Sequence, residues 1–254
     1  VAYQTSGNIA VGDEEVRRFM HFINGFNQLF DGNNNEVIRN KYTEIKEFLA
    51  NKKEGDMDNR DILTIKGLIR RGEARTSCTF NQIPLSRCHF LDLPFYETGK
   101  IEKNPISEAD IEIVLKLLRE VQPHQIYVAG DLADPHGTHR VCTDAVFAAV
   151  DAEKENGSEW LKECRIWMYR GAWAEWEIEN IEMAVPFSPE ELREKRNSIL
   201  KHQSQMESAP FLGNDERLFW QRSEDRNRGT ASLYDQLGLA CYEAMEAFVE
   251  YKPL

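Results

Sequence analysis

The segment that most constrains the fold of this chain is a short, almost wholly apolar run, Gln-Ile-Tyr-Val-Ala-Gly at 125–130. It has the length of a strand, and a nearly continuous apolar run is typical of a strand that is covered on both faces. A polar loop containing glycine and proline follows, and we expect a helix from about His139 to Lys154. A buried strand that leads through a loop into a helix favours an α/β fold with a largely parallel sheet.

Helix and strand patterns alternate along most of the chain. Ser107 and Ser188 each precede an acidic residue three positions later, which predicts capped helix starts at both places. We expect one three-layer, Rossmann-like α/β domain over 1–254, in which 13–60 forms a helical insertion near the N-terminus. The other expected helices cover 13–30, 36–51, 61–80 and 231–251, further strands cover 1–5, 89–94, 165–169 and 180–187, and solvated charged loops cover 52–60 and 224–228.

Composition argues against several classes of protein. Lys and Arg number 31 against 43 Asp and Glu, a formal net charge of −12, which disfavours binding to nucleic acid phosphates. The apolar runs are too short to span a bilayer, and no secretion signal opens the sequence. Five dispersed cysteines without a Cys-x-x-Cys pair are typical of reduced thiols. We therefore expect a cytoplasmic protein that binds neither nucleic acid nor membrane.

The loop at 130–140 carries the most chemically informative side chains. Asp131, Asp134, His136 and His139 follow the predicted strand directly, at the edge of the sheet where open α/β proteins bind ligands. Two imidazoles three residues apart can bind a metal or flank a substrate, and aspartates can ligate or orient them. A catalytic zinc needs three protein ligands and an open position, and this segment supplies at most two or three. The residues alone leave open the alternative that both histidines are structural or simply exposed.

The pattern Asp-Pro-His-x-x-His-Arg after a buried strand resembles the PIG-L/LmbE-like zinc-dependent N-deacetylases, which act on N-acetylated amino sugars and their conjugates. The likeness covers most of the chain outside 13–60. It is greatest to the deacetylase-like C-terminal region of certain bacterial glucosamine-6-phosphate deaminase homologues, and a region cut from a longer protein would explain the absent initiator Met. The supporting matches, in the family's order, are a Thr-x-Gly turn within 1–7, Arg-x-x-Glu-Ala at 70–74, Phe-Leu-x-Leu-Pro at 90–94 and His-x-Ser-Gln at 202–205.

The resemblance implies roles for individual residues. His139 matches a zinc ligand, and His136 matches the protonated histidine that stabilises the tetrahedral oxyanion. Asp134 lies where an aspartate commonly orients the loop. Arg70 matches a substrate-contacting arginine, and His202 is assigned to the active site by its family position alone.

Two departures from the family pattern limit this assignment. The family has Pro-Asp between its two histidines, where this chain has Gly137-Thr138. The family's other two zinc ligands and its general base lie in a His-Pro-Asp-Asp segment, which the 254 residues lack. A lone His139 holds zinc poorly, because affinity comes from several ligands acting together. We therefore expect a fragment without the first metal motif, and zinc as the cofactor of the complete family site.

The leading hypothesis is a metal-dependent, hydrolase-like domain of amino-sugar metabolism whose ligand is an amino sugar or its phosphate. In the complete family site, zinc-bound water with a pKa of about 7 would attack the acetamide carbonyl, while Arg70 would hold a hydroxyl or phosphate. The main alternative is a noncatalytic accessory or assembly domain of a glucosamine-6-phosphate deaminase/isomerase. A third is a sugar-binding module in which Trp173 and Trp176 stack on sugar rings. A homo-oligomer is compatible with all three.

Overall fold

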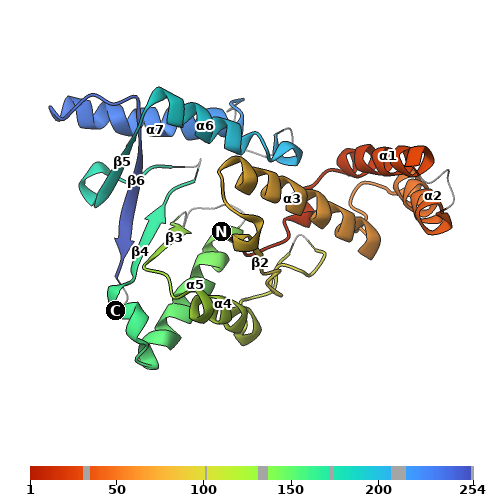
Figure 1. The fold of residues 1–254 in the computed structure, drawn as a ribbon, viewed down its shortest axis with the longest axis horizontal. Helices are drawn as coiled ribbons and strands as arrows, with labels where there is room; N and C mark the ends of the chain where they lie inside the picture. Colours follow the sequence, from red (N-terminus) through yellow and green to blue (C-terminus); the bar gives the residue numbers. More distant parts are fainter. Residues whose placement is uncertain (31–34, 101, 131–136, 172–173, 207–215, 253–254) are drawn as a thin grey trace.

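The structure of the chain is a computed structural model that describes residues 1–30, 35–100, 102–130, 137–171, 174–206 and 216–252. Its strands form two sheets (Figure 1). The smaller sheet pairs β1 (Ala2–Tyr3) with β2 (His89–Phe90) in parallel. The larger sheet has the order β3-β4-β6-β5, with β3 at Gln125–Ala129, β4 at Arg165–Tyr169, β5 at Met183–Phe187 and β6 at Ala244–Tyr251.

The predicted α/β class is confirmed, but the larger sheet is mixed. β3 and β4 are parallel, whereas β6 runs antiparallel to both of its neighbours, β4 and β5. The expectation of a mostly parallel sheet therefore does not hold for this sheet. The physical reason is β6, which enters the sheet after α6 and α7 and lies between β4 and β5 in the direction opposite to both.

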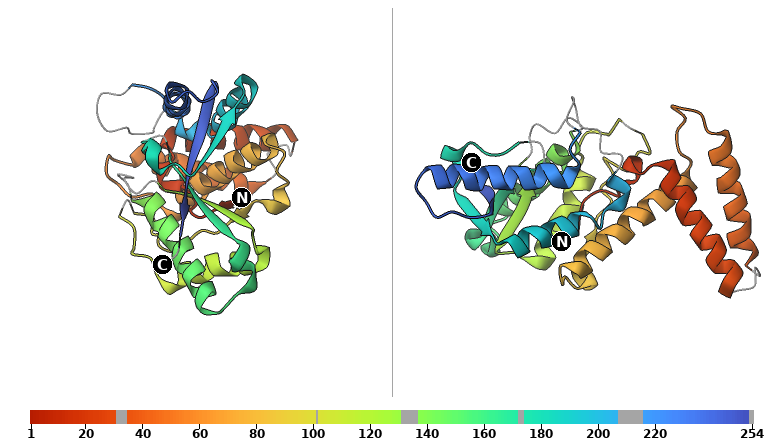
Figure 2. Two further views of the ribbon diagram at one scale, coloured as in Figure 1. Left: turned by 90° about the vertical axis from the view of Figure 1, so that its left-hand side faces the viewer. Right: turned by 90° about the horizontal axis from the view of Figure 1, so that it is seen from above.

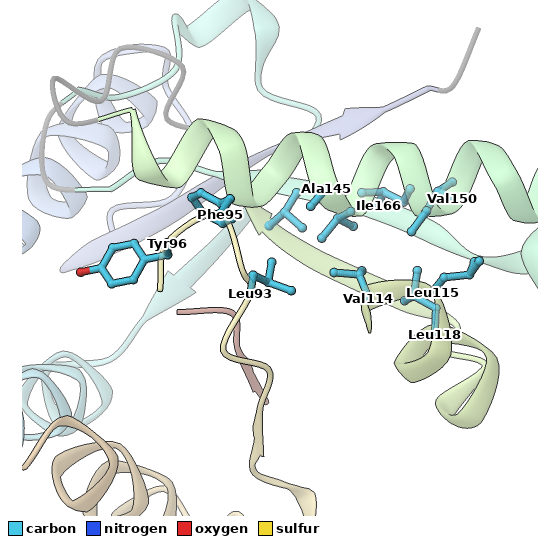
Figure 3. Packing of buried hydrophobic residues seen from close by; sticks show 12 residues of the cluster. Leu93, Phe95, Tyr96, Val114, Leu115, Leu118, Ala145, Val150 and Ile166 are labelled. Carbon is cyan, nitrogen blue, oxygen red and sulfur yellow. The ribbon is translucent and has the colours of Figure 1, made fainter. Parts of the chain in front are cut away.

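The main hydrophobic core lies between the larger sheet and two helices, α4 (Glu108–Val121) and α5 (Thr138–Glu155). Figure 3 shows how its side chains interlock. Ser107 caps α4 as predicted, and the buried carboxylate of Asp110 accepts hydrogen bonds from Ser107 and from the backbone N–H of Phe95. The core contains Leu93, Val114, Leu115 and Leu118, which pack against Ala145, Val146, Ala149, Val150 and Ile166.

Two helices, α6 (Pro189–Ile199) and α7 (Phe219–Gln236), contact the opposite face of β6. Side chains alternate between the faces of a strand. Tyr251 pairs with Ile166 on the side of the main core, so Glu246 points to the other side, where it meets Lys195 of α6 and Arg226 of α7. The capping box at Ser188 is confirmed at the start of α6.

The predicted helix over 231–251 is wrong beyond Gln236. α7 ends at Gln236, and the left-handed conformation of Gly238 (φ +80°) lies just beyond it. The residues from Ala244 onward form β6, whose first four side chains are all buried between neighbouring elements. Apolar residues three or four apart also fit a strand that is covered on both faces, and tertiary packing decides in favour of the strand.

The N-terminal part is helical, with α1 (Asp13–Phe30), α2 (Glu36–Asn51) and α3 (Arg60–Phe80) close to their predicted bounds. α1 and α2 form a hairpin that projects from the rest of the molecule (Figure 2). A small second core, which includes Val16, Ile45 and Ile62, joins the hairpin to α3. Whether this hairpin is an insertion in a single domain stays a prediction. Among the described residues, no helix is both long and apolar enough to cross a membrane.

Candidate functional site

Segments that follow β1, β2 and β3 meet around the side chain of Tyr96. Its hydroxyl points away from the residues of the main core (Figure 3) and lies near the backbone of Ile9. Arg70 of α3 and Cys142, one turn after His139 in α5, are close enough to act electrostatically on this hydroxyl. Burial raises the pKa of Tyr96 to about 12, so the phenol is neutral and can donate a hydrogen bond at neutral pH.

Arg70 lies at the centre of a polar group that we call the Arg70 cluster: Arg70, Glu73, His202 and Ser204. The Nη1 atom of Arg70 is 2.8 Å from Glu73 Oε2 and 3.5 Å from Ser204 Oγ. The buried carboxylate of Glu73 also accepts bonds from the backbone N–H of Ser204 (2.6 Å) and from its hydroxyl (2.8 Å). The motifs at 70–74 and 202–205, far apart in the sequence, therefore form one hydrogen-bonded unit.

His202 occupies the same cluster. Burial lowers the pKa of its imidazole, the nearby Arg70 lowers it further, and Glu73 offsets part of the effect. The ring is therefore neutral at neutral pH, with one nitrogen as donor and the other as acceptor. Its Nδ1 atom is buried and has no hydrogen-bond partner among the described residues, which marks a position where a ligand atom or a water could bind.

The loop after β1 packs closely against Arg70 of the cluster. Gly7 adopts a left-handed conformation (φ +66°), and a Cβ there would lie 3.0 Å from Arg70 Nε, so glycine lets the loop and the guanidinium approach closely. Ser6 donates to Glu97 through its backbone N–H and its hydroxyl, both at 3.0 Å. The side-chain oxygen of the buried Asn8, like Nδ1 of His202, has no partner among the described residues.

The predicted metal loop is only partly described. His139 is exposed in the first turn of α5, whereas Asp134, His136 and Trp173 lie outside the described residues. The part of the chain that the structure describes contains no group of three or more His, Cys, Asp or Glu side chains that could hold a metal ion. These residues therefore do not fit a zinc ion by themselves.

Trp176 closes the carboxyl ends of β3 and β4. Its indole N–H donates to the carbonyl of Met168 (3.2 Å), and the Arg170 guanidinium stacks over its ring at 4.5 Å. Only glycine fits at position 130, because a Cβ there would lie 2.7 Å from Trp176 and 2.8 Å from Met168. The indole is thus engaged in packing, which weakens the hypothesis that it stacks on a sugar.

Sequence patterns missed several members of the site. Tyr96, Glu97 and Asn8 carry no local signal, because their importance arises from contacts between segments distant in the chain. Glu73 did have a signal: it lies three residues after Arg70 in a helix, a spacing that places the two side chains side by side.

No family model matches the chain. Over its full 254 residues the chain is 84% identical to a protein of Bacteroides thetaiotaomicron (strain VPI-5482) that is named “glucosamine-6-phosphate deaminase-like”. The chain spans only 38% of the length of that relative.

Two solved structures, each at 15% sequence identity, resemble this chain. GalB, the 4-carboxy-2-hydroxymuconate hydratase from Pseudomonas putida KT2440, has a TM-score of 0.51 over 80% of this chain and 77% of its own. The zinc-inhibited form of teicoplanin deacetylase has a TM-score of 0.46 over 78% of this chain and 77% of its own. The likeness to GalB concerns the fold and not the chemistry. The predicted resemblance to a region of the bacterial glucosamine-6-phosphate deaminase homologues is thus confirmed.

Proposed function

We propose that this chain binds an amino sugar or an amino-sugar phosphate at the Arg70 cluster, as the substrate-holding part of a hydrolase-like, N-deacetylase-type domain with a three-layer, Rossmann-like arrangement. The observation that carries this proposal is a cation beside a buried polar atom that lacks a partner, with a second such atom in the adjoining loop after β1. Nδ1 of His202 and Oδ1 of Asn8 are both buried and unbonded among the described residues. A buried polar atom without a partner costs about 1–3 kcal/mol, so a ligand that bonds to it recovers a substantial free energy.

The chemistry of the cluster suits this ligand class. Of the three guanidinium nitrogens of Arg70, only Nη1 makes hydrogen bonds to described residues. Nε and Nη2 are left as donors for a phosphate or a hydroxyl. The amide oxygen of Asn8 accepts from a hydroxyl or an acetamide N–H, and the neutral imidazole of His202 can accept from or donate to a hydroxyl. Glu73 fixes the guanidinium and offsets its charge, so that the arginine keeps its position before the ligand arrives.

Catalysis is a further step of the proposal and depends on residues outside the described part. Asp134 and His136 are our candidates for the catalytic groups, Trp173 for a wall of the substrate site, and His139 for one metal ligand. The described residues do not form a metal site, so we derive no hydrolytic step from them. The support for a deacetylase-type reaction is the set of ordered motifs in the sequence. The name of the relative, glucosamine-6-phosphate deaminase-like, supports only an amino-sugar phosphate as the ligand class.

A noncatalytic accessory role is the second candidate. It is favoured by the lack of a metal site among the described residues, because these residues would hold a sugar without activating a water. Release of acetate from N-acetylglucosamine 6-phosphate separates the two candidates: binding with turnover supports the hydrolase, and binding without turnover supports the accessory role.

Isothermal titration of the chain with N-acetylglucosamine 6-phosphate and with glucosamine 6-phosphate tests the binding site. We expect Arg70→Met to weaken binding of at least one of them by tenfold or more, which is about 1.4 kcal/mol. Arg71→Met is the matched control, because Arg71 is the neighbouring arginine but pairs with Asp92 and stacks on Phe90 instead. If the wild type binds neither sugar, or if Arg70→Met binds as tightly as wild type, the proposal is wrong.

A further inference from the structure

The outer face of the α1–α2 hairpin is unusually apolar. Phe22, Phe26 and Phe30 of α1 are 68%, 55% and 70% exposed. They are four residues apart and therefore lie in a row along the helix, where consecutive rings contact one another at 6.3 and 4.6 Å between centroids. Leu29, which is 76% exposed, and Ile23 widen this row. We call these five residues the α1 stripe.

The stripe is separate from the face that α1 uses within the chain. Val16 and Met20 point into the second core between α1, α2 and α3 and are buried. The hairpin projects from the body (Figure 2), so no described part of the chain covers the stripe. Its position is also far from the main core, in which helices α4 and α5 cover the sheet (Figure 1).

The area of the stripe is in the range that a dimer needs. Side chains of this size and exposure leave about 120 Å² each open to solvent, or roughly 600 Å² for the five residues of the stripe. This is as large as the largest apolar patch on a typical monomer, and such patches commonly serve binding. Two such surfaces together bury about 1,200 Å², the lower limit of a specific protein interface.

The chemistry of the stripe favours a partner with the same surface. The run from His21 to Phe30 contains no Asp, Glu, Lys or Arg. The charges at the start of α1 are all paired: Glu14 with Arg17 and Glu15 with Arg18 within the helix, and Asp13 with the ammonium groups of Lys52 and Lys66. The stripe thus offers nothing to an oppositely charged partner, whereas a second copy presents an equally uncharged, aromatic row.

We propose that the chain forms a two-fold dimer through the α1 stripe. With the axis near Phe26 and the two α1 helices antiparallel, Phe22 of one copy lies opposite Phe30 of the other, so both rows are covered at once. This isologous arrangement closes on itself and does not propagate into a filament. It also opposes the dipoles of the two helices instead of aligning them.

Sedimentation equilibrium of the chain at about 100 µM tests the dimer, since an interface of this size supports a micromolar dissociation constant. We expect twice the monomer mass for the wild type, and at least tenfold weaker association for Phe26→Asp. Leu237→Asp is the matched control: it places the same charge on another exposed apolar residue, at the end of α7, and should still dimerise.

Circular dichroism verifies that each variant is folded. Should Phe26→Asp unfold, the milder double variant Phe22→Gln/Phe26→Gln takes its place. Amide exchange of the wild type gives a second readout, because exchange over 21–30 should be slower at high protein concentration. A wild-type chain that stays monomeric overturns the proposal, as does a Phe26→Asp variant that associates normally. Equal loss of association in Leu237→Asp would show that a negative charge, and not the stripe, is responsible.

Discussion

Two ionic clusters, one around Lys66 and one around Arg70, lie one helical turn apart on α3 and differ in how completely their polar atoms are paired. The first, which we call the Lys66 cluster, consists of Asp13, Lys52, Asp58 and Lys66, with each ammonium 2.6–2.7 Å from both carboxylates. Two cations and two anions thus pair completely, at the base of the hairpin. The Arg70 cluster has hydrogen-bonding atoms left over: Nδ1 of His202 lacks a partner among the described residues.

The difference separates a structural role from a binding role. A closed set of buried charges stabilises the arrangement that contains it, because removal of any member leaves the others unpaired. A cluster with unbonded buried atoms is less stable by itself and gains from a ligand that completes it. We therefore expect the Lys66 cluster to matter for stability and the Arg70 cluster to matter for binding.

The largest effect is expected from Lys66→Met. The substitution removes one of two cations from a group in which Lys66 is 4% exposed and Asp58 11%, and breaking a buried pair typically costs about 3–5 kcal/mol. Urea unfolding measures the loss, and Lys162→Met, which removes an exposed partner of Glu159, should change stability by less than about 1 kcal/mol. A similar small change in both variants would show that the Lys66 cluster does not hold the hairpin in place.

A smaller loss is expected from Glu73→Gln. The carboxylate accepts three hydrogen bonds, one from Arg70 and two from Ser204. The glutamine amide has an NH₂ group in place of one carboxylate oxygen, so it would face at least one of these donors with another donor. Hydrogen bonds to a charged group contribute about 1.5–3 kcal/mol, so we expect a destabilisation of about 1–2 kcal/mol together with weaker sugar binding. Glu190→Gln on the exposed start of α6 is the control and should alter neither property. A variant with wild-type binding would contradict the positioning role of Glu73.

The smallest effect concerns pH. The pKa of His202 is lower in the folded chain than its ordinary value of 6.5, because of burial and the nearby Arg70. The unfolded chain therefore takes up a proton that the folded chain does not, and stability falls as pH drops below 6.5. Asp13 and Glu246 have lowered pKa values because they pair with lysine or arginine side chains. Their protonation also reduces the stability of the chain, but at a more acidic pH.

The contribution of His202 to the pH dependence of stability is obtained by comparing the wild type with His202→Gln. Urea unfolding at pH 7 and pH 5 should show a smaller loss of stability for His202→Gln than for the wild type. Identical losses would mean that the imidazole is equally protonated in both states. Such a result would place His202 in contact with solvent and not inside the Arg70 cluster.

Local signals predicted much of the fold. α2 at 36–51 and β4 at 165–169 have the predicted bounds, and both serine caps are present, because these features depend on residues close in sequence. The failures depend on distant partners. β6 is a strand only because β4 and β5 flank it, and the antiparallel direction of β6 had no signal in its own residues.

Charged segments show the same limit. The run at 52–60 suggests a solvated loop, yet Asp58 is part of the Lys66 cluster, and the run at 224–228 lies in α7 with Arg226 paired to Glu175 and Glu246. Spacing cannot reveal a charge that is buried by a partner far along the chain. In the site, Arg70 and His202 came from a family resemblance, whereas Tyr96 required the structure.

The most direct test of the central claim uses the ring nitrogens of His202. In the chain labelled with ¹⁵N-histidine, addition of the tighter-binding amino-sugar phosphate should shift the Nδ1 resonance of His202, because that atom gains its missing hydrogen bond. The resonances of His21 and His124, which lie outside the cluster, should stay in place. Saturating sugar that leaves the His202 resonances unchanged would contradict the claim that the Arg70 cluster is the binding site.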